Sequence, residues 1–258
     1  MNYQCNIIIK GFKKADMLFL IYNSANKVGI MNSISEQMNQ KKFSLIASLP
    51  KNDIDLALAA QNGGADFLKV HLNVEHAASG TKFGSFESEF EIIKCIIDSV
   101  DIPVGIMPGS VNPASFEEML IMEKQGISFY DIYIEHMPVE YMKLSTMEPM
   151  VALSENWRRE DPGILKSSGF KMLEASIINH SAYGQPLVLS DLLSYSFILN
   201  EFEGKVVVPT QKEIKPSELP ELKKIGVSGV MIGKIVTGEK PNTFEKATSD
   251  FRKAINAL

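Results

Sequence analysis

The segment 229–234, with the sequence Gly-Val-Met-Ile-Gly-Lys, ends a series of eight short apolar runs. Each run is rich in β-branched or large apolar residues, and a stretch with apolar residues at three- and four-residue spacing follows it. The first pattern is typical of buried strands and the second of amphipathic helices. The predicted strands span residues 43–49, 65–72, 103–107, 129–135, 150–154, 170–177, 205–209 and 229–232.

Strands that alternate with helices indicate a parallel sheet. Eight such units close into a (β/α)8 or TIM barrel of about 250 residues, and this chain has 258 residues. An open, doubly wound sheet is the competing architecture, but no glycine-rich dinucleotide fingerprint follows the first predicted strand. We therefore predict an α/β protein with a single barrel over residues 43–258. Residues 1–42 are predicted to form an N-terminal helical lead-in packed on the barrel.

The composition argues against several classes of partner. The formal net charge of −5 disfavours a duplex-binding protein, which needs a basic face to displace counterions. The apolar run 17–22 is too short for a secretory signal core, and no run approaches the ~20 apolar residues that span a bilayer. Two cysteines, Cys5 and Cys95, do not make a disulfide framework. We expect a cytoplasmic protein that binds neither nucleic acid nor membranes, and homo-oligomer formation stays open.

Ionisable residues are predicted to point into the barrel from three strands. Side chains alternate along a strand, so that one parity faces the helices and the other faces the interior. In these strands one parity is apolar, which assigns it to the helix layer. The opposite parity then carries Phe67, Lys69 and His71 in the second strand, Asp131, Tyr133 and Glu135 in the fourth, and Met172, Glu174 and Ser176 in the sixth.

Lys69, Glu135 and Glu174 are predicted to form a cluster, because alternate strands feed the same interior layers of a barrel. An unpaired buried ammonium costs several kcal/mol, so Lys69 needs a carboxylate partner. A purely structural ion-pair network is one interpretation. The other is a catalytic cluster, in which Glu135 and Glu174 are general acid–base candidates. Lys69 would then act as a proton donor, an anchor for an enediolate, or a Schiff-base nucleophile.

The four histidines His71, His76, His136 and His180 all fall at or just past the carboxyl ends of predicted strands. The active sites of these barrels lie at that end. His71 and His136, with Glu135 or Glu174, have side chains of types that bind metals, but no two of the histidines share a tight ligand spacing. We predict no metal, and we predict no cofactor. A hydrogen-bonding or acid–base histidine is the favoured interpretation, and His71 is included among the catalytic candidates.

The loops after the seventh and eighth strands are the usual phosphate site of such barrels. They contain Thr210, Gln211, Gly233 and Lys234. A glycine lets backbone N–H groups approach an anion, and a lysine adds a charge. The alternative is that Gly233 only permits a tight turn. With the first interpretation, the predicted partner is a small phosphorylated metabolite.

Two stretches resemble the ribulose-phosphate-binding barrels, which include ribulose-phosphate epimerase, indole-glycerol-phosphate synthase and the keto-deoxy-phosphogluconate aldolases. Val208-Pro209-Thr210 is similar to the seventh strand of those aldolases, and residues 229–233 are similar to the closing strand of the whole group. This chain departs from the pattern at Gln211-Lys212, where the aldolases have glycines. The epimerase's metal-binding histidines and aspartates are not reproduced.

The resemblance implies a phosphosugar enzyme, and three hypotheses follow. The first is an isomerase or epimerase that moves a proton beside a carbonyl, with Lys69 and either Glu174 or Glu135 exchanging it. The second is a Schiff-base aldolase that uses Lys69, or Lys171 as a loose equivalent of the aldolases' lysine on the sixth strand. The third is a non-catalytic barrel that binds a phosphometabolite. In each case the long loops 73–86 and 179–186 could fold over the bound phosphate.

Overall fold

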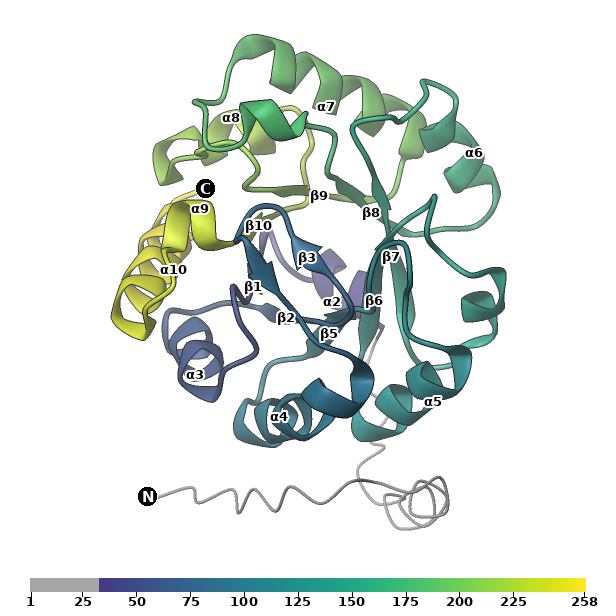
Figure 1. The fold of residues 1–258 in the computed structure, drawn as a ribbon. Coiled ribbons are helices and arrows are strands. Elements are labelled where there is room, and N and C mark those ends of the chain that lie inside the picture. Colours follow the sequence, from purple (N-terminus) through teal and green to yellow (C-terminus); the bar gives the residue numbers. More distant parts are fainter. Residues whose placement is uncertain (1–32) are drawn as a thin grey trace.

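The computed structural model describes residues 33–258 and shows a closed barrel of eight parallel strands (Figure 1). Neighbouring strands around the barrel follow the order β1, β2, β5, β6, β7, β8, β9 and β10, and β10 pairs with β1. The barrel strands are β1 (Ser44–Ser48), β2 (Phe67–His71), β5 (Val104–Met107), β6 (Phe129–Tyr133), β7 (Glu148–Leu153), β8 (Met172–Ala175), β9 (Lys205–Pro209) and β10 (Gly229–Ile232). The predicted fold class is therefore confirmed, and each predicted strand overlaps an observed one.

Helices surround the barrel, and one small sheet lies outside it. The α-helices are α2 (Ile34–Asn39), α3 (Ile54–Asn62), α4 (Phe86–Ser99), α5 (Phe116–Gln125), α6 (Asp161–Ser167), α7 (Leu189–Phe202), α8 (Leu219–Lys224), α9 (Lys234–Thr237) and α10 (Pro241–Asn256). Within residues 33–258, the three short 3-10 helices are η1 (Val139–Lys143), η2 (His180–Ala182) and η3 (Pro216–Glu218). The small sheet is an antiparallel hairpin of β3 (Glu75–His76) and β4 (Thr81–Lys82).

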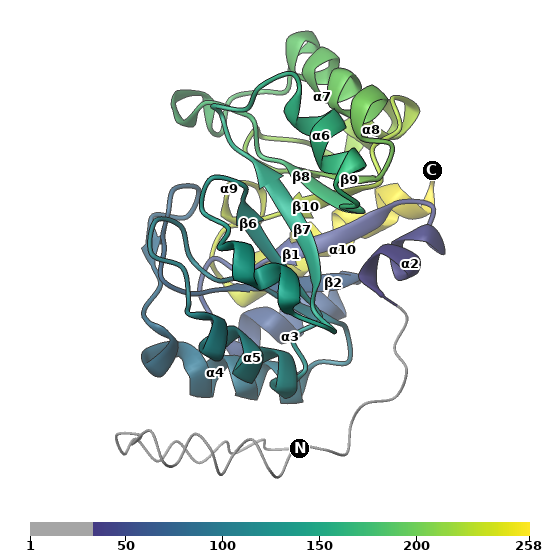
Figure 2. The ribbon, with the colours of Figure 1, turned by 90° about the vertical axis from the view of Figure 1, so that its right-hand side faces the viewer.

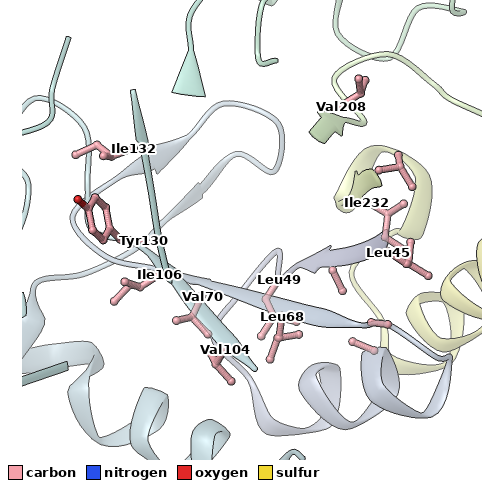
Figure 3. Packing of buried hydrophobic residues seen from close by; sticks show 14 of the residues in the cluster. Leu45, Leu49, Leu68, Val70, Val104, Ile106, Tyr130, Ile132, Val208 and Ile232 are labelled. Atoms are coloured by element: carbon pink, nitrogen blue, oxygen red, sulfur yellow. The ribbon is translucent and has the colours of Figure 1, made fainter. Parts of the chain in front are cut away.

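The predicted strand parity agrees with the packing. Leu68 and Val70 on β2 and Ile132 on β6 are buried in the layer between strands and helices, part of which Figure 3 shows. Phe67 and Met172 belong instead to a second cluster inside the barrel. Because the two clusters take opposite parities, the barrel has an apolar contact with its helices and a separate interior.

The lower half of the barrel interior is apolar and is closed by α2. Its buried members are Ile46, Phe67, Phe129, Met150, Met172, Val207 and Met231, and Ile34 and Met38 of α2 join the same cluster. Figure 2 shows α2 at one end of the barrel and α9 near the other. Part of the predicted helical lead-in, residues 1–32, lies outside the described residues. With its lower half filled by apolar side chains, the barrel leaves polar groups to the opposite half.

Candidate active site

A cavity of about 340 Å³ opens at the carboxyl ends of the barrel strands. Strand ends and the β3–β4 hairpin both contribute to its wall. Its polar lining residues include Ser48, Lys69, Asp131, Tyr133, Glu174, Ser176, Thr210 and Gln211, together with three of the four histidines, His76, His136 and His180. The predicted location of a polar site at this end of the barrel agrees with that lining.

Lys69, Asp131 and Glu174 form a buried cluster on the floor of the cavity. The ammonium of Lys69 lies 2.5 Å from Asp131 Oδ2 and 3.1 Å from Glu174 Oε2. The three residues come from β2, β6 and β8, the second, fourth and sixth barrel strands, and none is more than 5% exposed. Ser176 donates a further hydrogen bond from its hydroxyl to Glu174 Oε1. Alternate strands thus bring one cation and two carboxylates into a single layer.

The charges in this cluster balance when the two carboxyl groups share one proton. Burial, followed by the negative charge of Glu174, raises the pKa of Asp131 well above its usual range. Burial opposes ionisation of Glu174 too, but the Lys69 ammonium and hydrogen bonds from Asp131 and Ser176 lower its pKa to about 2. Burial likewise opposes the charge on Lys69, yet the two carboxyl groups raise the pKa of its ammonium above the ordinary value. These directions favour a single proton shared by the two carboxyl groups beside the Lys69 ammonium, so the three groups titrate together.

The prediction that Glu135 points into the barrel and joins the Lys69 cluster is wrong. Glu135 is exposed and accepts a hydrogen bond from the Ser154 hydroxyl, outside the cluster. The reason is that β6 ends at Tyr133, where the chain turns: the N–H groups of His136 and Met137 both donate to the Tyr133 carbonyl. The alternation of a strand cannot be extended past that point. Asp131, which has the same predicted parity, takes the place expected for Glu135.

His71 is placed inward, as predicted, but it does not line the cavity. It is fully buried, with Nε2 3.3 Å from Ser48 Oγ and its ring stacked on Phe83 at 4.6 Å between centroids. Burial, and then the charges of His76 and Lys69, lowers the pKa of His71 well below its usual value. Because His71 lies behind the residues that line the cavity, its ring does not contact a molecule bound there. His76, from the β3–β4 hairpin, lines the cavity instead.

The predicted phosphate residues separate into two groups. Thr210, Gln211 and Gly233 line the same cavity as Lys69. The Gly233 N–H donates to Thr210 Oγ1 at 3.1 Å, and the Gln211 amide nitrogen donates to the Tyr183 hydroxyl at 2.5 Å. These loops thus present a hydroxyl and amide groups along one side of the cavity.

Gly233 is not explained by a tight turn. Its backbone is extended, with φ −146° and ψ −169°, a region that any residue adopts. A Cβ atom built at this position would come no closer than 3.7 Å to the Ser48 carbonyl oxygen, an ordinary contact. The alternative interpretation, that the fold itself requires glycine here, is therefore wrong.

Neither Lys234, predicted to bind phosphate, nor Lys171, a candidate for the Schiff-base lysine, lines the cavity. The Lys234 ammonium is 2.8 Å from the Ser79 carbonyl oxygen and 2.8 Å from a carboxylate oxygen of Glu239, so it ties a loop instead of lining the cavity. Lys171 is exposed just before β8, beside a groove that also includes Ser33. That position is at the amino ends of the strands, opposite the cavity, which excludes the aldolase hypothesis for Lys171.

No group of three or more histidine, cysteine, aspartate or glutamate side chains within residues 33–258 is arranged to hold a metal ion. No helix in the same range is long and apolar enough to cross a membrane.

The closed parallel barrel, with its polar cavity at the carboxyl ends of the strands, defines a (β/α)8 barrel. No protein-family model matches the chain, and no curated protein matches it by sequence. Solved structures do match. Thiamine phosphate pyrophosphorylase from Pyrococcus furiosus is 16% identical with a TM-score of 0.61, and the match covers 85% of this chain and 98% of that one.

Two further structures are similar over comparable lengths. KGPDC from Streptococcus mutans is 12% identical with a TM-score of 0.61, and the match covers 84% of this chain and 98% of that one. Phosphoribosyl anthranilate isomerase from Thermus thermophilus is 14% identical with a TM-score of 0.60, and the match covers 84% of this chain and 100% of that one. Identities this low show a shared fold. The predicted resemblance is therefore confirmed for the barrel fold.

Proposed function

We propose that the protein is an enzyme that moves a proton beside the carbonyl of a small phosphorylated sugar or keto acid. The observation that carries the proposal is the cluster of Lys69, Asp131 and Glu174, buried on the floor of a cavity whose side includes Thr210 and Gly233. Groups with strongly shifted pKa values in a cavity are typical of catalytic sites. The similar structures support the substrate class, because their names include phosphorylated compounds and an isomerase.

The proposed reaction uses both carboxyl groups. The ionised Glu174 accepts the proton as the C–H bond beside the carbonyl breaks, and the electron pair moves to form an enediolate. Asp131, which carries the shared proton, returns a proton either to the opposite face of the same carbon or to the neighbouring carbon. In the second case the hydroxyl proton also moves from one enediolate oxygen to the other. The pair then holds one proton, as it did at the start. The Lys69 ammonium stabilises the enediolate oxygen, and Glu174 becomes more basic as Lys69 turns toward that oxygen.

Lys69 is better suited to this electrostatic role than to forming an imine. An imine requires the unprotonated amine, whereas two carboxyl groups hold the pKa of Lys69 above its ordinary value. The experiment described next also distinguishes the proton-transfer proposal from the two other hypotheses, a Schiff-base aldolase and a non-catalytic binding protein.

Hydrogen exchange with solvent tests the proposal even though the substrate is unidentified. We expect the protein in D2O to incorporate deuterium beside the carbonyl of at least one member of a panel of phosphorylated aldoses, ketoses, amino sugars and keto acids, read by NMR. Glu135→Gln is the matched control, because it removes a carboxylate from the same β6 region outside the cavity. This variant should exchange at the wild-type rate, and unphosphorylated members of the panel should exchange more slowly.

Other results would overturn the proposal. Binding of a phosphorylated sugar with no exchange at any position would indicate the non-catalytic barrel. A permanent adduct at Lys69 after borohydride treatment in the presence of a carbonyl substrate would indicate the Schiff-base aldolase.

Gly233→Val tests the phosphate side of the cavity. A Cβ atom fits at this position, and the valine γ carbons can extend into the cavity that Gly233 lines, so we expect a melting temperature close to that of the wild type. A valine beside Ser48 would keep an anion from the backbone N–H groups of the loop. Loss of one hydrogen bond to a charged group costs about 1.5–3 kcal/mol, so the affinity for a phosphorylated pentose, measured by calorimetry, should fall about 10- to 100-fold. Gly163→Val in α6, where a Cβ also fits, is the control and should bind normally; equal affinity in both variants would place the phosphate elsewhere.

A further inference from the structure

The β3–β4 hairpin forms part of the cavity wall above the Lys69 cluster. Five consecutive residues, 74–78, line the cavity. Figure 1 shows the hairpin across the carboxyl end of the barrel. The hairpin belongs to the segment 73–86, one of the two long loops that, from the sequence, could fold over a bound phosphate. It carries His76 into the cavity wall, a residue with no role in the reaction described above.

The His76 ring is held from several sides. Its Nδ1 atom lies 3.0 Å from Ser79 Oγ. The ring centroid is 4.8 Å from that of His71 and 6.3 Å from that of Phe83, which it meets edge to face. A ring with these contacts has a defined orientation, which a hydrogen-bond donor in an active site needs.

The partners of Ser79 decide which nitrogen of His76 carries the proton. Ser79 Oγ accepts a hydrogen bond from the Thr81 N–H at 3.3 Å, and Ser79 is 5% exposed. If Nδ1 were the protonated nitrogen, the single hydroxyl hydrogen of Ser79 would have no acceptor among the described residues. The hydroxyl therefore donates to Nδ1, and a neutral His76 carries its proton on Nε2. Nε2 makes no hydrogen bond within residues 33–258 and is not a buried unpartnered atom, so it remains accessible.

His76 is neutral and lies within electrostatic range of the cluster. Burial, and then the positive charge of Lys69, lowers the pKa of His76 to about 4, against an opposing effect of Glu174. The ring is therefore a hydrogen-bond donor and not a cation at neutral pH. A neutral donor stabilises a developing oxyanion without protonating it or repelling Lys69.

We propose that His76 is a catalytic residue that donates its Nε2–H to the carbonyl oxygen of the substrate as this oxygen gains negative charge. The proposal rests on the proposed function. In the step, the C–H bond breaks, its proton moves to a carboxylate, a C=C bond forms, and the carbonyl π electrons move to oxygen. Lys69 and His76 bind that oxygen together, and His76 keeps its proton throughout.

Ser79 and Lys234 are positioning residues in this arrangement. Ser79 selects the tautomer of His76 through its hydroxyl. Lys234, which follows the Gly233 loop, donates to the Ser79 carbonyl at 2.8 Å and so ties the hairpin to the β10 end of the barrel. The lysine predicted to contact phosphate thus holds the segment that carries the donor.

Paired variants in the deuterium-exchange assay test the role of His76. We expect His76→Leu to slow exchange about 10²- to 10³-fold, the effect of removing one oxyanion donor. His76→Gln, which places an amide N–H near the position of Nε2, should recover at least tenfold of that loss. Equal losses in both variants, or a wild-type rate in His76→Leu, would overturn the role of His76 while leaving the proposed function in place. No exchange by the wild-type protein would overturn both.

Nitrogen chemical shifts of labelled histidine test the arrangement independently of any substrate. The wild-type spectrum should show His76 neutral at pH about 7, with its proton on Nε2. Ser79→Ala and Lys234→Met should shift the population toward the Nδ1 tautomer or broaden the signals, and both should lower the exchange rate. Lys82→Met, at an exposed site of the same hairpin, should change neither. An Nδ1–H tautomer in the wild-type protein would overturn the proposal.

Discussion

Lys69→Met is expected to abolish proton transfer, with a loss of at least about 10³-fold in the exchange rate, because both the charge for the enediolate and the partner of the carboxylates disappear. It is also expected to lower the free energy of unfolding by about 3–5 kcal/mol at neutral pH, the usual result of breaking a buried ion pair by removing one side. Asp131 and Glu174 would be left buried without their cation.

The stability loss in Lys69→Met should depend on pH. In the wild type the pKa of Glu174 is lowered from 4.5 to about 2. The contribution of Glu174 to the free energy of unfolding is therefore present above pH 4.5, and it is lost as the pH falls through the folded-state pKa of this group. Without Lys69, burial raises the pKa of the same group, so the variant is destabilised as the pH rises above 4.5. The unfolding free energies of the two proteins, measured with denaturant, should approach each other as the pH falls below 4.5 and should converge only toward pH about 2.

A compensating variant keeps this test decisive if Lys69→Met folds poorly. Lys69→Met combined with Asp131→Asn and Glu174→Gln carries no buried charge in the cluster and should regain most of the stability at neutral pH. It should remain inactive. Recovery of exchange in the triple variant, or a pH-independent stability loss in the single one, would contradict the charge arrangement derived for the cluster.

Asp131→Asn is expected to separate activity from stability. Asp131 is the carboxyl group that holds the shared proton, since burial and Glu174 raise its pKa. An asparagine imitates that neutral acid in shape and in its ability to accept from Lys69 and donate to Glu174, so unfolding free energy should change by about 1 kcal/mol or less. An amide cannot return a proton to carbon, so the exchange rate should fall about 10²- to 10⁴-fold.

The measurements for Asp131→Asn are thermal or denaturant unfolding and the same exchange assay. Asp131→Ala is the comparison, because it removes the hydrogen-bonding group and leaves a void beside Lys69. It should cost both stability and activity. A loss of several kcal/mol in Asp131→Asn would show that Asp131 is ionised in the folded protein, and full activity would exclude it from proton transfer.

Much of the fold is predictable because strands and helices leave different periodicities in the sequence. The predicted and observed bounds of β9 and β10 are the same. The parity of β2 and β8 correctly assigns Lys69 and Glu174 to the interior, since an apolar helix layer accepts only one set of alternate residues. The two-residue strands of the β3–β4 hairpin are too short to show alternation, and the role of α2 as the floor depends on contacts distant in sequence.

The candidate site is predicted less completely. Asp131 and Glu135 share a parity, so strand alternation cannot distinguish them, and the sequence does not mark that β6 ends at Tyr133. The residues after Tyr133 carry no clear turn or helix-capping signal, which is the kind of signal that would have favoured Asp131 over Glu135. His76 lies in a segment that the sequence identifies only as a closing loop. A lysine beside a glycine loop suits an anion, yet the long side chain of Lys234 reaches Ser79 instead.

The sequence by itself determined that eight strand–helix units close into a barrel, and which parity of side chains points inward in the second, fourth and sixth strands. Both properties follow from local periodicity, which every segment carries within itself. Only the tertiary structure decided which ionisable groups meet, because this depends on where each strand stops and on the register between strands. The ion pairs of Lys69 with Asp131 and Glu174, and the hydrogen bond from Lys234 to the Ser79 carbonyl, are examples of such contacts between distant segments.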